Sequence, residues 1–337
     1  MDNHEDLHLE ILGADEHSSS ERTLGAALFG ADAHALPGAA PGDAGAAPLA
    51  RVSMPLLLGR SAVIERWRTA GAVRAGSHAT ARYAHSGEFL FGSLQLIEDS
   101  HAAGHTALER ATQRAYREIH ATLEASGFAH LLRVWNYIPD INLETHGTER
   151  YRQFNSARQE ALMSCGRDIR GHVPAASALG STGGPLSIYF LAGRVAPAFI
   201  ENPRQVSAYH YPAQYGPRAP SFSRATLVRH RAATLFISGT SSILGHRTLH
   251  EGDPAAQTRE TLSNIEALLG EANRLRAGTF RLDSLTYKIY VRRPEDLPLI
   301  RAEIDSAVGA RAPRVYLRAD ICRRDLSMEI EAVGQRT

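Results

Sequence analysis

The sequence predicts an α+β fold with two similar halves, in which helices pack on one face of mixed sheets. The order of strand-like and helix-like segments is typical of such sheets. Two helical segments, 107–126 and 254–272, also align with each other, with Ile119 on Ile265. Each leads into a strand that ends in Pro-Asp or Pro-Glu-Asp. This weak internal repeat indicates a duplicated α+β unit.

In chain order, the first expected feature is a loop. Residues 35–50, ALPGAAPGDAGAAPLA, are nearly all Ala, Gly and Pro and are expected to form a loop or linker. Between 51 and 106, apolar runs such as VSMPLLLG and GEFLFGSLQLI are typical of strands. Residues 107–126 carry apolar side chains at helical spacing. The following HLLRVWNYIPDIN alternates as a strand does and stops at Pro139.

The second half repeats this order. PAAQTRETLSNIEALLGEA (254–272) is expected to be an amphipathic helix, SLTYKIYVRRPED a strand ending at Pro294, and LPLIRAEIDSAVG another helix. Further strands are expected at PLSIYFLAG, ATLFISGT, RVYLRADI and LSMEIEAV, and a helix at 149–162. The expected divisions are an N-terminal segment 1–50, an N-terminal half 51–185 and a C-terminal half 186–337 that carries most of the site.

Composition narrows the class of protein. The 337 residues are 43% hydrophobic and 22% charged, an ordinary globular balance. A net charge of +1 favours neither nucleic acid nor membrane surfaces as partners. No apolar run approaches the ~20 residues of a membrane span, and the acidic N-terminus does not resemble a signal peptide. We expect a cytoplasmic protein that binds a small molecule, either as a monomer or as a small homo-oligomer.

The cysteine, histidine and lysine content further restricts the possible chemistry of the chain. Two cysteines give neither a disulfide framework nor metal-ligand spacing, and Cys165 is expected to be a packed thiol at a helix end. His246 and His250 lack a third ligand, so we expect no metal. Lys288 is the single lysine, so cations for binding are expected to be arginine or histidine.

Two segments combine arginine with tyrosine. In ERYRQFNSARQEAL, Tyr151 and Arg158 are seven apart and share a helix face, although the pattern alone favours a solvated Arg/Glu face. In SAYHYPAQYGPRAPSFSRATLV (207–228), Arg224 offers a planar fork for a carboxylate and Tyr211 a hydroxyl. An ordinary surface loop also explains that segment.

The remaining candidates are ambiguous from pattern alone. The glycine-rich turns GSTGGPLSIYF and FISGTSSILGH match neither a Walker A loop nor GxGxxG, and tight turns are the commoner explanation. In LSMEIEAV, alternation places Glu329 on the polar, solvent-facing side of a strand. Cys322, seven residues earlier, fits a small buried filler.

Taken together, these segments resemble the chorismatase family. The resemblance rests on RVWNYIPDIN, ERYRQFNSAR, the Tyr/Pro/Arg segment ending in SFSRA, FISGTSSILGH and ADICRRDLSMEIE, which occur in the family's order from about residue 130 onward. The C-terminal half also resembles the small trimeric YjgF-like deaminases. The resemblance therefore implies two YjgF-like (chorismate-mutase-like) units.

The resemblance also implies a substrate and roles for residues. Chorismate carries two carboxylates, a ring hydroxyl and an enolpyruvyl ether. Arg158 and Arg224 match the family's carboxylate-binding arginines, Tyr151 and Tyr211 its substrate-contacting tyrosines, and Glu329 its essential acid. A partly desolvated Glu329 would donate a proton to the enol ether methylene.

Two further positions concern the product. Family members that form 3-hydroxybenzoate are similar to this chain in having Cys at 322 and Gly, at 239, in the SGT turn. The resemblance therefore implies a chorismatase that makes 3-hydroxybenzoate and pyruvate, with 4-hydroxybenzoate also open, and needs no cofactor. The alternatives are hydrolysis to the non-aromatic 3,4-dihydroxycyclohexa-1,5-diene carboxylate, a YjgF-like imine deaminase and a non-catalytic binder.

Overall fold

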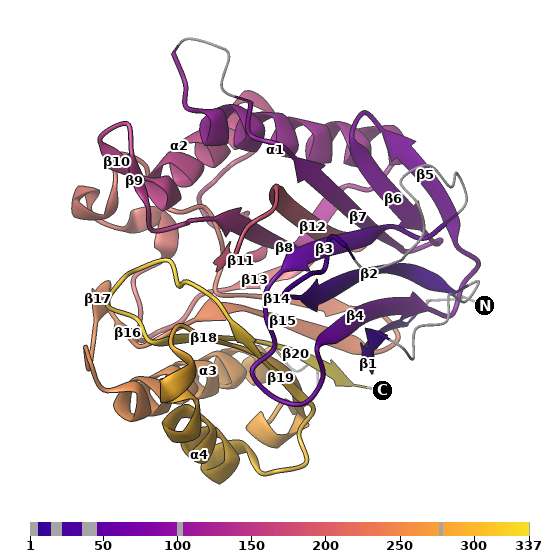
Figure 1. Cartoon of the computed structure of the whole chain (residues 1–337). Helices are drawn as coiled ribbons and strands as arrows, with labels where there is room; N and C mark the ends of the chain where they lie inside the picture. The colour runs from indigo at the N-terminus through magenta and orange to yellow at the C-terminus, as the bar shows by residue number, and fades with distance from the viewer. Residues whose placement is uncertain (1–5, 15–21, 36–45, 100–103, 276–278, 337) are drawn as a thin grey trace.

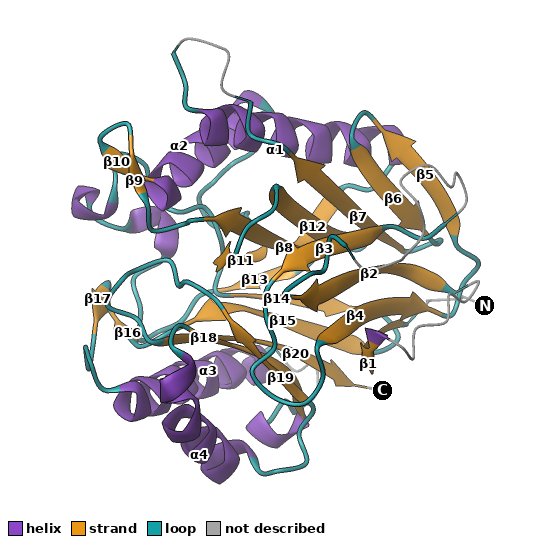
Figure 2. Ribbon diagram, in the orientation of Figure 1, coloured by secondary structure: helices purple, strands orange, loops and turns teal. Residues whose placement is uncertain are grey.

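Three β-sheets surround one hydrophobic core, and helices cover the outer faces of two of them (Figure 1, Figure 2). The computed structural model describes residues 6–14, 22–35, 46–99, 104–275 and 279–336.

The elements of each sheet follow in chain order. The first sheet contains β1 (Leu7–Gly13), β2 (Thr23–Gly30), β3 (Leu49–Ser53) and β4 (Ala62–Thr69). The second contains β5 (Arg74–His78), β6 (Ala81–His85), β7 (Phe89–Leu96), β8 (His130–Pro139), β11 (Ala175–Ser181) and β12 (Leu186–Gly193). The third contains β13 (Ala198–Ile200), β14 (Ala225–Arg229), β15 (Ala233–Thr240), β18 (Leu285–Val291), β19 (Arg314–Arg318) and β20 (Met328–Arg336).

The helices lie where the sequence predicts them. They are α1 (Ala107–Ser126), α2 (Arg150–Ser164), α3 (Pro254–Arg274) and α4 (Leu297–Val308). Helix α1 begins at a capping box of Thr106 and Glu109, and α3 at Asp253, whose side chain accepts the Ala256 N–H. The short ribbons are β9 (Glu144–Thr145) with β10 (Thr148–Glu149) and β16 (Ile243–Leu244) with β17 (Arg247–Thr248).

The predicted duplication is confirmed by strand order. The second sheet runs β11-β8-β12-β7-β6-β5 and the third, read from its other edge, β19-β18-β20-β15-β14-β13. Each begins with a parallel pair at one edge and continues antiparallel. Helices α1 and α3 occupy the same place in this order, as do α2 and α4. The α+β prediction, with helices on one face of each sheet, is therefore correct.

The first sheet repeats the order and relative direction of the first four strands of the other two sheets. Its order, β3-β2-β4-β1, again begins with a parallel pair, and β2–β4 and β1–β4 are antiparallel. The prediction of a loop over 35–50 is wrong at its end, because Leu49 and Ala50 pair with β2. Residues 36–45 of that prediction lie outside the described residues. The chain thus supplies three related sheets to one core.

The change from the second to the third sheet lies between 193 and 198. Strand β12, which the sequence pattern assigned to the C-terminal half, pairs with β7 and β8 of the second sheet. The expected divisions at 50 and 185 therefore do not coincide with sheet boundaries, and the limits of independently folding domains stay a prediction.

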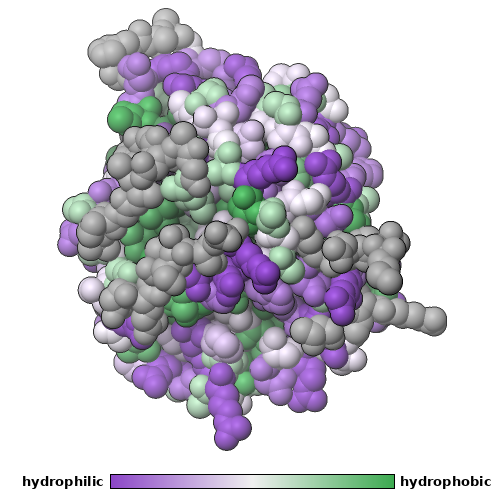
Figure 3. Space-filling view, turned by 90° about the vertical axis from the view of Figure 1, so that its right-hand side faces the viewer, coloured by the Kyte–Doolittle hydropathy of each residue, from purple (hydrophilic) through white to green (hydrophobic). Residues whose placement is uncertain are grey.

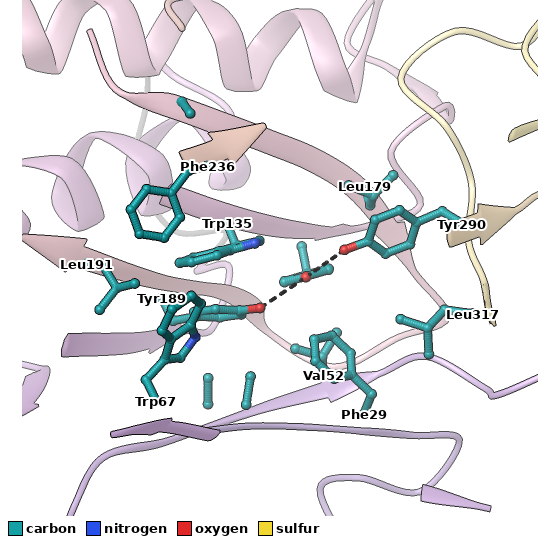
Figure 4. Packing of buried hydrophobic residues seen from close by; sticks show 14 of the residues in the cluster. Phe29, Val52, Trp67, Trp135, Leu179, Tyr189, Leu191, Phe236, Tyr290 and Leu317 are labelled. Atoms are coloured by element: carbon teal, nitrogen blue, oxygen red, sulfur yellow. Dashed lines mark hydrogen bonds between the residues drawn. The ribbon is translucent and has the colours of Figure 1, made fainter. Parts of the chain in front are cut away.

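Strand β8 shows why buried and exposed residues do not alternate along the central strands. Its residues 131–138 are all buried. Leu132, Trp135 and Tyr137 face the central core, whereas Val134 and Ile138 pack under the helices. The central core joins aromatic side chains from all three sheets (Figure 4). Trp135 and Tyr189, for example, stack with ring centroids 4.5 Å apart. On the face of the molecule shown in Figure 3, hydrophilic and hydrophobic residues are intermixed.

Candidate active site

A cleft lies where the second sheet meets the third. Here β11 packs beside β15, with the Ala176 N–H bonded to Ser238 Oγ at 2.9 Å and the Gly239 N–H to Ser177 Oγ at 3.0 Å. The cleft has a volume of about 570 Å³, and a narrow inner extension of about 30 Å³ continues from it. Both spaces are lined by Tyr151, Phe222, Gly239, Cys322 and Glu329.

Glu329 lies at the junction of these two spaces and is only 4% exposed. The prediction that it faces solvent is wrong, because both faces of β20 are buried. Met328 and Ile330 pack beneath α3 and α4, while Glu329 and Glu331 face the second sheet. Burial, and secondly the Glu331 carboxylate, raise the pKa of Glu329 to about 8. At neutral pH this side chain is therefore a buried carboxylic acid with a proton to donate.

Gly239 provides the space that the Glu329 carboxyl group occupies. A Cβ atom at position 239 would lie 1.9 Å from Glu329 Oε1 and 2.8 Å from its Cδ. Contacts under 3.0 Å are not tolerated by real Cβ atoms, so any larger residue would displace the acid. Ser241, two residues on, lies 3.5 Å from Glu329 Oε2.

Cys322 is half-buried and lies beside the same carboxyl group. Its Sγ is 4.0 Å from Glu329 Oε2, the outer limit of a thiol hydrogen bond. Burial, and then the neighbouring Glu329, raise the pKa of the Cys322 thiol to about 12. Cys322 is therefore a neutral thiol near pH 7, suited to weak hydrogen bonding rather than to nucleophilic attack.

Helix α2 brings Tyr151 and Arg158 to the inner extension. Arg158 is 2% exposed, and its Nη2 donates to Asn155 Oδ1 at 2.9 Å. The sequence pattern favoured a solvated face for this helix, which is wrong at Arg158, since the helix packs against the second sheet. An arginine buried beside a cavity is suited to binding an anion there.

Arg224 and Tyr211 contact each other on the wall of the larger cleft. Arg224 Nη2 donates to Tyr211 Oη at 2.8 Å and to the Val206 carbonyl at 2.9 Å, and Arg224 is 4% exposed. The structure thus brings together all seven side chains or glycines that the sequence pattern and the resemblance singled out. Their roles in catalysis and binding stay a prediction.

Arg323 and Tyr215 are two of the cleft residues that sequence reasoning missed. Arg323 lies 4.1 Å from the ring centroid of Tyr215 and 5.2 Å from that of Tyr211, and its Nη1 donates to the His246 carbonyl at 2.9 Å. Both Arg323 and Tyr215 line the cleft. The available signal was the position of Arg323 directly after Cys322.

Cys165 has no contact with this site. It is a half-buried free thiol that ends helix α2, as expected. In the part of the chain that the structure describes, no three His, Cys, Asp or Glu side chains are grouped to hold a metal ion. Among the described helices, none is both long and apolar enough to cross a membrane.

Comparison with known proteins shows which family this chain matches. Residues 65–192 match the family model described as chorismatase FkbO/Hyg5-like, N-terminal. The chain is 41% identical to a 3-hydroxybenzoate synthase of Streptomyces hygroscopicus, over 80% of each chain. It is 37% identical to a chorismatase of Streptomyces rapamycinicus, over 80% of this chain and 81% of that one. A crystal structure of a chorismatase aligns with 98% of this chain and 99% of its own, with a TM-score of 0.87 and 32% identity.

Proposed function

This chain belongs to the chorismatase family, and we propose that it converts chorismate to 3-hydroxybenzoate and pyruvate. The observation that carries the proposal is the buried Glu329 carboxyl group, whose pKa is raised to about 8, with Cys322 Sγ 4.0 Å from its Oε2. The relative named 3-hydroxybenzoate synthase supports this product. Another relative is named only as a chorismatase, so its name does not distinguish the aromatic product from the diol.

The cleft suits a small dianion. Its volume of about 570 Å³ lies in the range of ligand pockets. Arg158 at the inner end and Arg224 on the wall are buried cations for the two carboxylates of chorismate. Tyr211, bonded to Arg224, and Tyr151 supply hydroxyl groups beside them.

The reaction begins with proton transfer from Glu329 to the methylene carbon of the enol ether. The resulting oxocarbenium ion weakens the bond between the ring carbon and the ether oxygen. The neighbouring ring hydroxyl oxygen attacks that carbon within the substrate, pyruvate leaves with the ether oxygen as its ketone, and the hydroxyl proton returns to Glu329. The epoxide formed then opens and loses a ring proton, giving the phenol. Chorismate is thus split into two products with no water consumed and no redox step.

Cys322 supports the intramolecular route over hydrolysis. The neutral thiol fills the wall next to Glu329, where a water molecule would otherwise attack, and it can hold a proton during ring opening. Opening of the other epoxide bond gives 4-hydroxybenzoate, so a minor share of that isomer fits the same route. Hydrolysis to the non-aromatic diol would require water beside the oxocarbenium ion.

A product assay tests the proposal. Purified protein is mixed with chorismate without added cofactor, and organic acids and pyruvate are quantified by chromatography. We expect 3-hydroxybenzoate and pyruvate in equal amounts. Pyruvate with the diol alone would refute the assigned product, and unchanged chorismate would refute the assigned reaction. The Glu329→Gln variant, which keeps the side-chain shape without the acid proton, is the control for contaminating activity.

A further inference from the structure

A cluster of buried charges lies behind Glu329 and contains the only lysine of the chain. Lys288 Nζ on β18 lies 2.5 Å from Glu65 Oε2 and 2.7 Å from Glu331 Oε1. Arg133 Nη2 on β8 lies 2.9 Å from Glu331 Oε2. All four side chains belong to residues no more than 5% exposed. The cluster therefore links β4, β8, β18 and β20 across all three sheets.

The charges of this cluster cancel. Glu65 and Glu331 contribute two negative charges, and Lys288 and Arg133 two positive ones. Glu331 also accepts hydrogen bonds from Trp135 Nε1 at 2.8 Å and Ser177 Oγ at 2.6 Å. Burial alone would raise the pKa of Glu331, but Lys288 and Arg133 hold it below its ordinary value. Lys288, which it shares with Glu65, and Arg133 therefore keep Glu331 ionised.

Glu329 is a third buried carboxyl group, and it lies on the same face of β20 as Glu331. It lies two residues before Glu331, and side chains two apart on a strand point the same way. No Lys, Arg or His nitrogen of the described residues lies within 4.0 Å of its oxygens, unlike the oxygens of Glu331. The titratable and charged groups that act on it are Tyr151 from α2, Arg133 from β8, Arg224 before β14, Cys322 after β19, and Glu331.

We propose that Glu331, fixed as an anion by Lys288 and Arg133, is a positioning residue that keeps the proton on Glu329. A buried ionised Glu329 would add an uncompensated negative charge to a neutral cluster, which is costly in the protein interior. In the complex of the proposed function, the substrate carboxylates occupy Arg158 and Arg224, so these arginines do not cancel the charge. The inference rests on the proposed function for this step and for Glu329 as the acid.

The same cluster also positions the acid geometrically. Ser177 Oγ contacts Glu331 and Arg133 Nη2, and it accepts the Gly239 N–H at 3.0 Å. Gly239 in turn provides the space for Glu329 Oε1. The substitution Glu331→Gln retains the shape of the carboxylate but loses its charge. It is therefore expected to change the proton affinity of Glu329 more than it changes the position of the Glu329 side chain.

The test is an infrared titration of the protein without substrate. The carbonyl band of a protonated carboxylic acid is followed between pH 5 and 10, and the component lost in Glu329→Gln is assigned to Glu329. We expect Glu331→Gln to lower the midpoint of that band by about one pH unit or more. The double variant Glu331→Gln/Lys288→Met, which removes one charge of each sign, is expected to return the midpoint toward that of the wild type.

A midpoint unchanged in Glu331→Gln, or lowered equally in the double variant, would overturn the inference. If the single variant does not fold, the double variant alone still decides, because a midpoint well below the wild-type value contradicts charge balance. The alkaline limb of kcat/KM for pyruvate release is expected to shift with the band, whereas a merely structural role would lower the rate at every pH. The band requires no turnover, so it is interpretable even if chorismate is not the substrate.

Discussion

Replacing Glu329 by glutamine is expected to stabilise the protein at alkaline pH while removing its activity. The amide has nearly the shape of the carboxyl group but stays neutral. In the wild type the pKa of Glu329 rises from its ordinary value of 4.5 to about 8, chiefly through burial. Because the folded-state pKa is the raised one, the stability from this group is complete below about pH 4.5. It is lost as the pH rises through about 8.

The magnitude follows from the shift. A difference of about 3.5 pKa units, at ~1.36 kcal/mol each, gives roughly 5 kcal/mol as the largest effect. Urea unfolding of both proteins from pH 5 to 9.5 measures it. The advantage of Glu329→Gln over the wild type should grow between pH 5 and 8 and then level off. Its rate of pyruvate release should fall on the order of 10³-fold.

Matched controls make this result decisive. Glu124→Gln makes the same change of carboxylate to amide at an exposed position of α1 and is measured beside it. If the Glu329→Gln difference did not grow with pH, Glu329 would be ionised in the folded protein at pH 7. It could not then be the proton donor, and the reasoning from burial and the Glu331 charge would be refuted.

Three substitutions test other parts of the site. Gly239→Ala would force Glu329 Oε1 to move by about 1 Å from a contact of 1.9 Å, so kcat/KM should fall on the order of 10²-fold. The control is Gly270→Ala on α3, where an added Cβ would have no neighbouring atom within 4 Å and activity should be unchanged. Equal activity of the two variants would contradict the predicted clash with Glu329. Cys322→Ala should keep chorismate consumption within about tenfold and shift the products toward the diol, whereas an unchanged product ratio would remove Cys322 from the route. Arg158→Lys should raise KM for chorismate without unfolding the protein, because an ammonium group cannot make the two parallel hydrogen bonds of a guanidinium to a carboxylate. An unchanged KM would place the substrate carboxylate elsewhere.

Helices and central strands were predictable because their signals are local. Helix α1 has apolar residues at helical spacing and a terminal Gly127 in the left-handed conformation, and α3 begins after Asp253 with Pro254. The first sheet was missed because the sequence before residue 50 carries no helical spacing of apolar residues that would mark the repeat. Residues 14–22, ADEHSSSER, are nearly all polar, and residues 35–48 are nearly all Ala, Gly and Pro.

The site was predictable only in part. Resemblance to a family supplied Glu329 and Gly239, but alternation assigned Glu329 to solvent. The alternation rule assumes that one face of the strand is exposed to solvent, whereas both faces of β20 are buried. The contact between the carboxyl group and Gly239 joins residues 90 positions apart and is invisible in the chain. The sequence offered one signal for the cluster of buried charges: Lys288 is the only lysine of the chain, which contains 36 arginines.

The central claim is that Glu329 gives a solvent-exchangeable proton to the enol ether methylene, and turnover in D₂O tests it most directly. The protein is equilibrated in D₂O, mixed with chorismate, and quenched early, and the pyruvate methyl group is analysed by mass spectrometry. One deuterium per pyruvate is predicted at the earliest times, together with unlabelled ring positions in 3-hydroxybenzoate. Pyruvate released without deuterium would mean that its hydrogen comes from the substrate itself, and Glu329 would not be the acid.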